Sequence, residues 1–219
     1  MNQSEVVHIP TEVRGRVLLR EASISPAPLL AGFHGYGENA ERLLEAIVEI
    51  PGITTWNVAV IQALHPFYNT KTGEVVASWM TKQDRELVIE DNLAYVTSAL
   101  AAAKRHFKTV GPNAFLGFSQ GTAMAYRAAA LTDHPCDGLI ALAGDMPADL
   151  GLPGAKSIPR VLIGRGTGDT WYDHAKLESD VARLQADSSS VEICVFEGGH
   201  EWTAEFRAAA RDFLEQLRR

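Results

Sequence analysis

The sequence predicts an α/β fold in which a mostly parallel central sheet carries helices on both faces. Short apolar runs of strand length alternate along the chain with longer segments in which apolar residues recur every three or four positions. Most of the short runs are apolar throughout. That pattern is typical of strands covered on both faces, and such burial is the rule in parallel sheets.

The apolar runs predict strands, and these occupy residues 13–19, 29–33, 58–62, 114–117, 138–143, 160–164 and 191–196. The three-to-four periodicity predicts helices at residues 40–50, 89–107, 122–131, 172–186 and 206–217. Residues 69–73 are polar and turn-like, so we expect the stretch 65–79 to make a small excursion. It is the one segment expected to cover a site partly, which implies a minimal lid or none.

The composition indicates one ordinary globular domain spanning residues 1–219. The chain has 46% hydrophobic and 21% charged residues, which excludes disorder and coiled coil. Its formal net charge of −7 argues against nucleic acid as a partner, because that requires clustered Lys and Arg. The same charge disfavours strongly anionic substrates and anionic membrane surfaces.

The two cysteines, Cys136 and Cys194, are too few for a disulfide framework, and no Cys/His cluster indicates a metal. No glycine-rich nucleotide motif is present, so no cofactor is expected. The first residues lack the pattern of a signal peptide, and no apolar run approaches the ~18 residues of a membrane span. We therefore expect a cytoplasmic protein without stable membrane insertion; the oligomeric state is left open.

A candidate nucleophile lies between a predicted strand and a predicted helix. Gly117-Phe118-Ser119-Gln120-Gly121 is a G-x-S-x-G sequence in a strand–turn–helix context. A tight turn there requires glycine at both flanking positions and lifts the hydroxyl of Ser119 above the sheet. It also directs the first amides of the following helix at whatever that hydroxyl attacks.

A serine hydroxyl needs a base within hydrogen-bonding reach, and His200 is the best placed of the seven histidines. It follows the last predicted strand through Gly198 and Gly199 and precedes the last helix. His65, in a loop before a proline, could also line the site. His200 is predicted to be the base because of its position after a strand.

The imidazole of a base needs a carboxylate partner that orients it and stabilises its protonated form. Asp169 follows the predicted strand 160–164 on a glycine-containing loop and is our first choice. Asp145, after the preceding strand, and Asp173, at the start of a helix, are the alternatives. With Asp169, the chain order is serine, acid, histidine, which is the order of the α/β-hydrolase class.

A tetrahedral intermediate needs backbone N–H donors directed at its oxyanion. His34-Gly35-Tyr36-Gly37 follows the second predicted strand and is the expected wall of such a hole. We predict that the amides of Tyr36 and Gln120 are the donors. Glu38 is expected to hold the turn or to cap the next helix.

These residues together resemble the phospholipase/carboxylesterase family of α/β-hydrolases, whose relatives include acyl-protein thioesterases. The resemblance covers nearly the whole chain and rests on five short segments: residues 34–37, Ser78-Trp79, 117–121, Gly168-Asp169 and Gly199-His200-Glu201. It implies an α/β-hydrolase fold and a triad of Ser119, Asp169 and His200. It also implies oxyanion donors at Tyr36 and Gln120, and a tryptophan near the acyl site, Trp79.

Two positions depart from the family pattern. Glu38 stands where many relatives have aspartate, and Asp145-Met146-Pro147 stands where relatives often have a small polar and then an apolar residue. The extra carboxylate of Asp145 could alter the choice of substrate or make the mouth of the pocket polar.

Large apolar side chains fall in or beside the predicted strand-end loops, and they suit an uncharged acyl or aryl group: Trp79, Met146, Trp171 and Trp202.

The leading hypothesis is a serine hydrolase of carboxylic esters or thioesters, with a small-molecule substrate. The alternative is a non-catalytic binding or receptor protein on a hydrolase scaffold. An intact Ser/Asp/His set argues against the alternative, because binding alone does not need all three.

Overall fold

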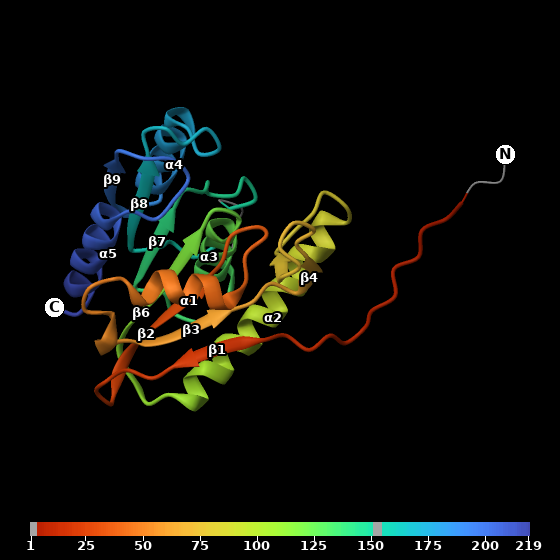
Figure 1. Ribbon diagram of the computed structural model, residues 1–219, viewed down its shortest axis with the longest axis horizontal. Helices are drawn as coiled ribbons and strands as arrows, with labels where there is room; N and C mark the ends of the chain where they lie inside the picture. Colours follow the sequence, from red (N-terminus) through yellow and green to blue (C-terminus); the bar gives the residue numbers. More distant parts are fainter. Residues whose placement is uncertain (1–3, 151–154) are drawn as a thin grey trace.

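The computed structural model describes residues 4–150 and 155–219. In these residues a seven-stranded sheet forms the centre of the molecule, in the order β1-β3-β2-β6-β7-β8-β9. β1 runs antiparallel to β3, and every other neighbouring pair is parallel. The predicted mostly parallel sheet is therefore confirmed (Figure 1).

The strands of this sheet are β1 (Val17–Arg20), β2 (Ala27–Phe33), β3 (Asn57–Ile61), β6 (Thr109–Phe118), β7 (Gly138–Leu142), β8 (Arg160–Gly166) and β9 (Ser190–Phe196). The helices are α1 (Ala40–Val48), η1 (Ile53–Thr55), α2 (Arg85–His106), α3 (Gln120–Leu131), α4 (His174–Ala186) and α5 (Ala204–Leu217).

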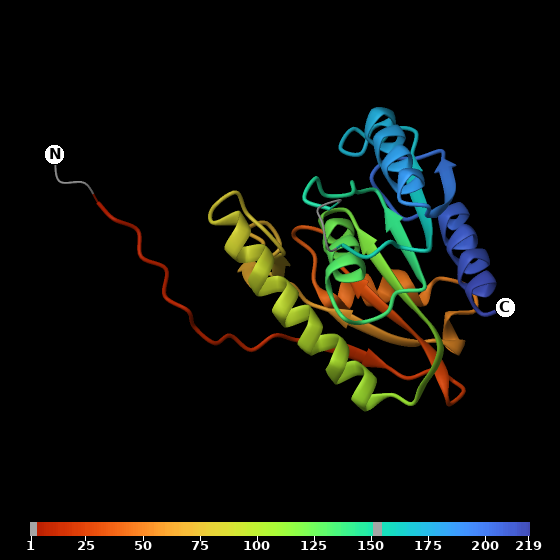
Figure 2. The same ribbon diagram turned by 180° about the vertical axis from the view of Figure 1, so that it is seen from behind.

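Two apolar cores cover the two faces of the sheet. One contains buried residues of α2, α3 and α4, such as Leu100, Met124 and Leu184. The other contains buried residues of α1 and α5, such as Leu43 and Phe213. Figure 2 shows from behind how the long helix α2 crosses the sheet. β2, β3 and β7 are buried along their whole length, which is why their sequences are continuous apolar runs.

The polar excursion at 65–79 is a β-hairpin, which the sequence did not reveal. β4 (His65–Tyr68) pairs antiparallel with β5 (Val75–Ser78) around the turn at 69–73. β4 contains Pro66 and is exposed throughout, so it lacks the alternating pattern that predicts a strand. An isolated bridge between Glu38 and Ala77 attaches the hairpin to the loop after β2.

The first strand is shorter than predicted. Residues 13–16 of the expected strand lie outside β1, and Val13 is exposed. The parallel strands β2, β6, β7, β8 and β9 all end at one edge of the sheet, so the loops that follow them meet there. The predicted site residues lie in or next to these loops, or in the segment after β5.

Candidate active site

Ser119 occupies a sharp turn between the end of β6 and the start of α3. Its backbone has φ +52° and ψ −121°, a conformation that non-glycine residues adopt at an energetic cost. The amide of Ser119 donates to the carbonyl of Leu142 at 2.9 Å, which fixes the turn to the end of β7. The strained turn therefore presents the hydroxyl at the edge of the sheet.

The two flanking glycines are required by space. A Cβ on Gly117 would lie 2.4 Å from the Cα of Thr122, and one on Gly121 would lie 2.0 Å from the carbonyl oxygen of Phe33. Both clashes are with backbone, which cannot swing aside. The turn thus packs closely against both the first turn of α3 and the end of β2.

Ser119, His200 and Asp169 form a continuous hydrogen-bonded chain. The Oγ of Ser119 lies 2.8 Å from Nε2 of His200, and Nδ1 of His200 lies 2.9 Å from Oδ2 of Asp169. The side chain of Asp169 is fully buried. Its second oxygen, Oδ1, accepts the amides of Trp171 at 2.8 Å and Tyr172 at 3.0 Å, so the carboxylate is held from both sides.

The two alternative carboxylates lie elsewhere. The Asp145 side chain is 59% exposed and lies 3.7 Å from the ammonium of Lys176. Asp173 caps α4, where its Oδ1 accepts the amide of Lys176 at 2.9 Å. Asp169 is thus the one of the three whose carboxylate contacts His200.

The glycine-rich loop after β2 lies against Ser119. A Cβ on Gly35 would lie 3.3 Å from the Cβ of Ser119. Among the described residues, neither the amide of Tyr36 nor that of Gln120 donates to a backbone acceptor. Gln120 N is the first amide of α3, at the positive end of the helix dipole.

His34 holds this loop rather than facing the hydroxyl of Ser119. Its Nδ1 lies 2.8 Å from the carbonyl of Gly35, and its Nε2 accepts the amide of Ala63 at 3.0 Å. Nδ1 therefore donates and the ring is neutral. His34 is fully buried, and this burial lowers its pKa.

Glu38 also has a structural place. Its carboxylate accepts the amide of Gly35 at 2.8 Å, and burial raises its pKa above the ordinary value. Its backbone pairs with Ala77 of β5. Glu38 thus connects the loop after β2 to the β4–β5 hairpin. Of its two expected roles, holding the turn or capping the next helix, it has the first.

Two adjoining hollows open beside Ser119. The first, of about 230 Å³, is lined by Ser119 and His200 together with Trp171, whose side chain is 76% exposed. The second, of about 440 Å³, lies between the segment after β5, the first turns of α3 and the loop after β7. Gln120, Ala123 and Asp145 line both hollows and so form their shared border.

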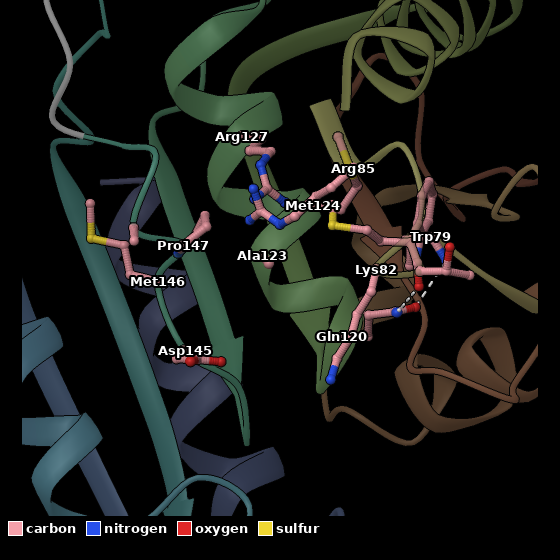
Figure 3. A pocket seen from close by; sticks show the side chains of 13 residues that line it. Trp79, Lys82, Arg85, Gln120, Ala123, Met124, Arg127, Asp145, Met146 and Pro147 are labelled. Atoms are coloured by element: carbon pink, nitrogen blue, oxygen red, sulfur yellow. Dashed lines mark hydrogen bonds between the residues drawn. The ribbon is translucent and has the colours of Figure 1, made fainter. Parts of the chain in front are cut away.

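The second hollow brings together two more of the predicted substrate-binding residues, Trp79 and Met146 (Figure 3). Both are largely buried, at 1% and 7% exposure, so they form its walls. Trp202 lies outside both hollows. The centroid of its ring lies 6.0 Å from that of the Phe118 ring, and the centroid of the Phe118 ring lies 5.3 Å from that of the His200 ring.

Comparison with known proteins identifies the family of the chain. The family model for phospholipase/carboxylesterase matches residues 25–218. The chain belongs to this family. It is therefore an esterase-type hydrolase with the α/β-hydrolase fold, as the resemblance of its motifs implied. No curated protein sequence matches the chain.

Solved structures of similar fold have low sequence identity to the chain. Esterase PE8 is 22% identical with a TM-score of 0.78 over 94% of this chain and 100% of its own. A carboxylesterase from Mesorhizobium loti is 20% identical with a TM-score of 0.75, covering 92% and 94%. Zea mays acyl-protein thioesterase 2 is 16% identical with a TM-score of 0.73, covering 93% and 99%.

The side chain of Gln120 has a positioning role that the sequence did not reveal. Its Oε1 accepts the amide of Trp79 at 2.9 Å, and its Nε2 donates to the carbonyl of Met80 at 3.0 Å. Trp79 Nε1 donates to the carbonyl of His34 at 2.9 Å. The segment after β5 is therefore tied both to the Ser119 turn and to the loop after β2. No sequence spacing signals this pairing, because it joins residues about 40 positions apart.

In residues 4–150 and 155–219, no three His, Cys, Asp or Glu side chains are grouped to hold a metal ion. Within the same ranges, no helix is both long and apolar enough to span a membrane.

Proposed function

We propose that this esterase-type hydrolase cleaves carboxylic esters or thioesters of small molecules through an acyl-enzyme on Ser119, within a single domain formed by residues 1–219. The observation that carries the proposal is the hydrogen-bonded chain from Ser119 Oγ through His200 to Asp169, with links of 2.8 and 2.9 Å. A hydroxyl, an imidazole and a buried carboxylate in that order are what nucleophilic acyl transfer requires.

In the first step, Ser119 Oγ attacks the carbonyl carbon while Nε2 of His200 accepts the hydroxyl proton. That proton passes to the departing oxygen or sulfur, and the bond from the carbonyl carbon to it breaks. Asp169 accepts the hydrogen bond of Nδ1–H and stabilises the imidazolium. A water molecule then repeats the sequence, with His200 as its base, and releases the acid and free Ser119.

The amides of Tyr36 and Gln120 are the proposed donors to the oxyanion. Support comes from their position: one follows Gly35, where an added Cβ would lie 3.3 Å from the Cβ of Ser119, and the other directly follows Ser119 and begins α3. Fixed amides that need no reorganisation stabilise developing negative charge more than water does. Neither amide is committed to a backbone acceptor in the described part of the chain.

The two hollows support an assignment of one half of the substrate to each. The leaving group must lie near His200, because it takes its proton from that ring, so the hollow lined by Trp171 receives it. The acyl group then extends into the hollow lined by Trp79 and Met146. Trp202 supports the ring of Phe118 behind His200, where it would shape the leaving-group side.

A fluorophosphonate probe tests the nucleophile directly. We expect the folded protein to gain one probe adduct, located by mass spectrometry on the peptide that contains Ser119. Ser119→Ala should remain unlabelled, and Ser78→Ala, which alters a neighbouring hydroxyl, should still be labelled. A folded wild-type sample without an adduct on Ser119 would contradict the proposal and would favour the non-catalytic binding alternative.

A further inference from the structure

Three cationic side chains line the hollow assigned to the acyl group. We call it the acyl-side hollow; it has a volume of about 440 Å³ and its walls include Lys82, Arg85 and Arg127. One carboxylate, that of Asp145, lines it as well, at the border with the Ser119 hollow. An apolar acyl chain needs none of these charges, so their presence bears on the choice of substrate.

Arg85 and Arg127 share a single carboxylate. Arg127 is buried and donates to both oxygens of Asp149, at 2.8 and 2.7 Å, while Arg85 donates to Oδ1 of Asp149 at 3.2 Å. The Arg127 guanidinium holds the pKa of Asp149 down at about 2, so this carboxylate is ionised at neutral pH. Two positive charges therefore face one negative charge.

Lys82 adds a further positive charge to the lining of the acyl-side hollow. Its side chain is exposed, and in the part of the chain that the structure describes it forms no salt bridge. An exposed ammonium without a carboxylate partner is free to meet an anion that enters the hollow. Together with Asp145 and with Asp149, which the two arginines share, the three cations leave a net charge of +1.

The negative charge in the hollow lies at the other end. Asp145 is near Ser119, where its carboxylate faces Lys176 at 3.7 Å. Figure 3 shows Arg85 and Arg127 side by side at the top of the hollow and Asp145 at the bottom. The two arginines therefore lie at the end of the hollow away from Asp145.

We propose that the acyl-side hollow selects acyl groups whose far end carries a carboxylate, so that the preferred substrates are half-esters or half-thioesters of dicarboxylic acids. This inference rests on the proposed function, because it assumes that Ser119 attacks the ester. Arg85 and Arg127 lie at the end of the hollow away from Asp145, so a carboxylate that meets them is separated from the reacting carbonyl by several methylenes. The whole-chain charge of −7 predicts the opposite preference, but charges at the hollow act at shorter range and are less screened.

The test compares two esters that differ only in the terminal charge. They are mono-p-nitrophenyl adipate and the neutral p-nitrophenyl ester of monomethyl adipate. We expect the wild type to show a kcat/KM about tenfold higher for the anionic ester, the gain of one charge-assisted contact. Lys82→Glu and Arg85→Gln should each lower the ratio of the two kcat/KM values by about fivefold to tenfold.

The matched control is Lys71→Glu, in the turn of the β4–β5 hairpin, which changes the net charge by the same amount outside both hollows. It should leave the ratio unchanged. Lys82 is exposed, so its variant remains informative even where Arg85→Gln disturbs the pairing with Asp149.

The outcomes separate the two proposals. Hydrolysis of both esters without preference, or with a preference that Lys82→Glu and Arg85→Gln leave intact, overturns the inference and leaves the proposed function standing. Labelling of Ser119 by the fluorophosphonate without hydrolysis of either ester also overturns the inference alone. Absence of both labelling and hydrolysis overturns the proposed function, and the inference falls with it.

Discussion

The two oxygens of Asp169 have different partners. Oδ2 faces Nδ1 of His200, while Oδ1 accepts two backbone amides, those of Trp171 and Tyr172. A substitution that removes the charge but keeps one carbonyl oxygen can therefore separate catalysis from folding. Asparagine does this, because its oxygen can stay on the amides while its NH₂ group meets the imidazole.

Asp169→Asn is expected to lower kcat by about 10³-fold to 10⁴-fold, because an NH₂ group opposite Nδ1 favours the wrong tautomer of His200 and does not stabilise the imidazolium. The measurement is the turnover of a short p-nitrophenyl ester, with circular dichroism to verify folding. Asp173→Asn serves as the control, since asparagine caps α4 as well as aspartate does and activity should be retained.

Asp145→Asn is expected to lower kcat by less than about tenfold, because its carboxylate does not contact the imidazole. If Asp145→Asn abolished turnover and Asp169→Asn did not, Asp145 would be the orienting acid.

Residues that directly follow strands could be located from the sequence, because parallel strands end at the same edge of the sheet and the residues after them meet there. Hydrogen bonds between side chains and distant parts of the backbone could not be predicted in this way. Nothing in the sequence indicates that Gln120 would bind the backbone of Trp79 and Met80, or that both nitrogens of His34 would be occupied by backbone groups. Such contacts depend on the final packing of loops.

At the scale of elements, the turn between β6 and α3 is the most constrained part of the site. Gly117→Ala is expected to lower the free energy of unfolding by about 3 kcal/mol, because the added Cβ would lie 2.4 Å from a backbone atom of α3. Urea denaturation measures the change. Gly199→Ala is the matched control: its Cβ would lie 3.7 Å from its nearest neighbour, so its stability should stay within about 1 kcal/mol of the wild type. Equal stability of the two variants would show that the turn can relax.

The elements that the sequence predicted well are those whose pattern follows from burial. The apolar runs of β2, β3 and β7 are buried on both faces, and the stripes of α2 and α5 face the cores. The β4–β5 hairpin has no such pattern, because β4 is exposed throughout and is fixed by backbone pairing with β5 and, through Ala77, with Glu38. Backbone pairing of exposed segments leaves little trace in side-chain type.

At the scale of the whole molecule, His34 links segments that are distant in the chain. Its ring binds Gly35 after β2 and Ala63 after β3, and its carbonyl accepts the indole of Trp79 after β5. Protonation of the ring would remove the acceptor for the amide of Ala63 and place a charge in the core. The folded state therefore resists protonation of this histidine, in agreement with its lowered pKa.

This coupling predicts how global stability depends on pH. The unfolded chain binds a proton at His34 near pH 6.5, while the folded chain binds it only at a lower pH, so the folded state loses stability as the pH falls below about 6.5. The contribution of one proton is at most about 1.4 kcal/mol per pH unit, and it ends below the folded pKa. Urea unfolding of the wild type at pH 7.5, 6.5 and 5.5 should show this decline.

His34→Gln and His34→Phe remove the titrating group in two different ways, and both will lower absolute stability. Their decline between pH 6.5 and 5.5 should nevertheless be shallower than that of the wild type, and equal in the two variants, because neither residue binds a proton. The comparison depends on slopes, so it separates titration from lost packing. If the free energy of unfolding of both variants fell with pH as steeply as that of the wild type, protonation of His34 would not be the cause of the loss of stability at acidic pH.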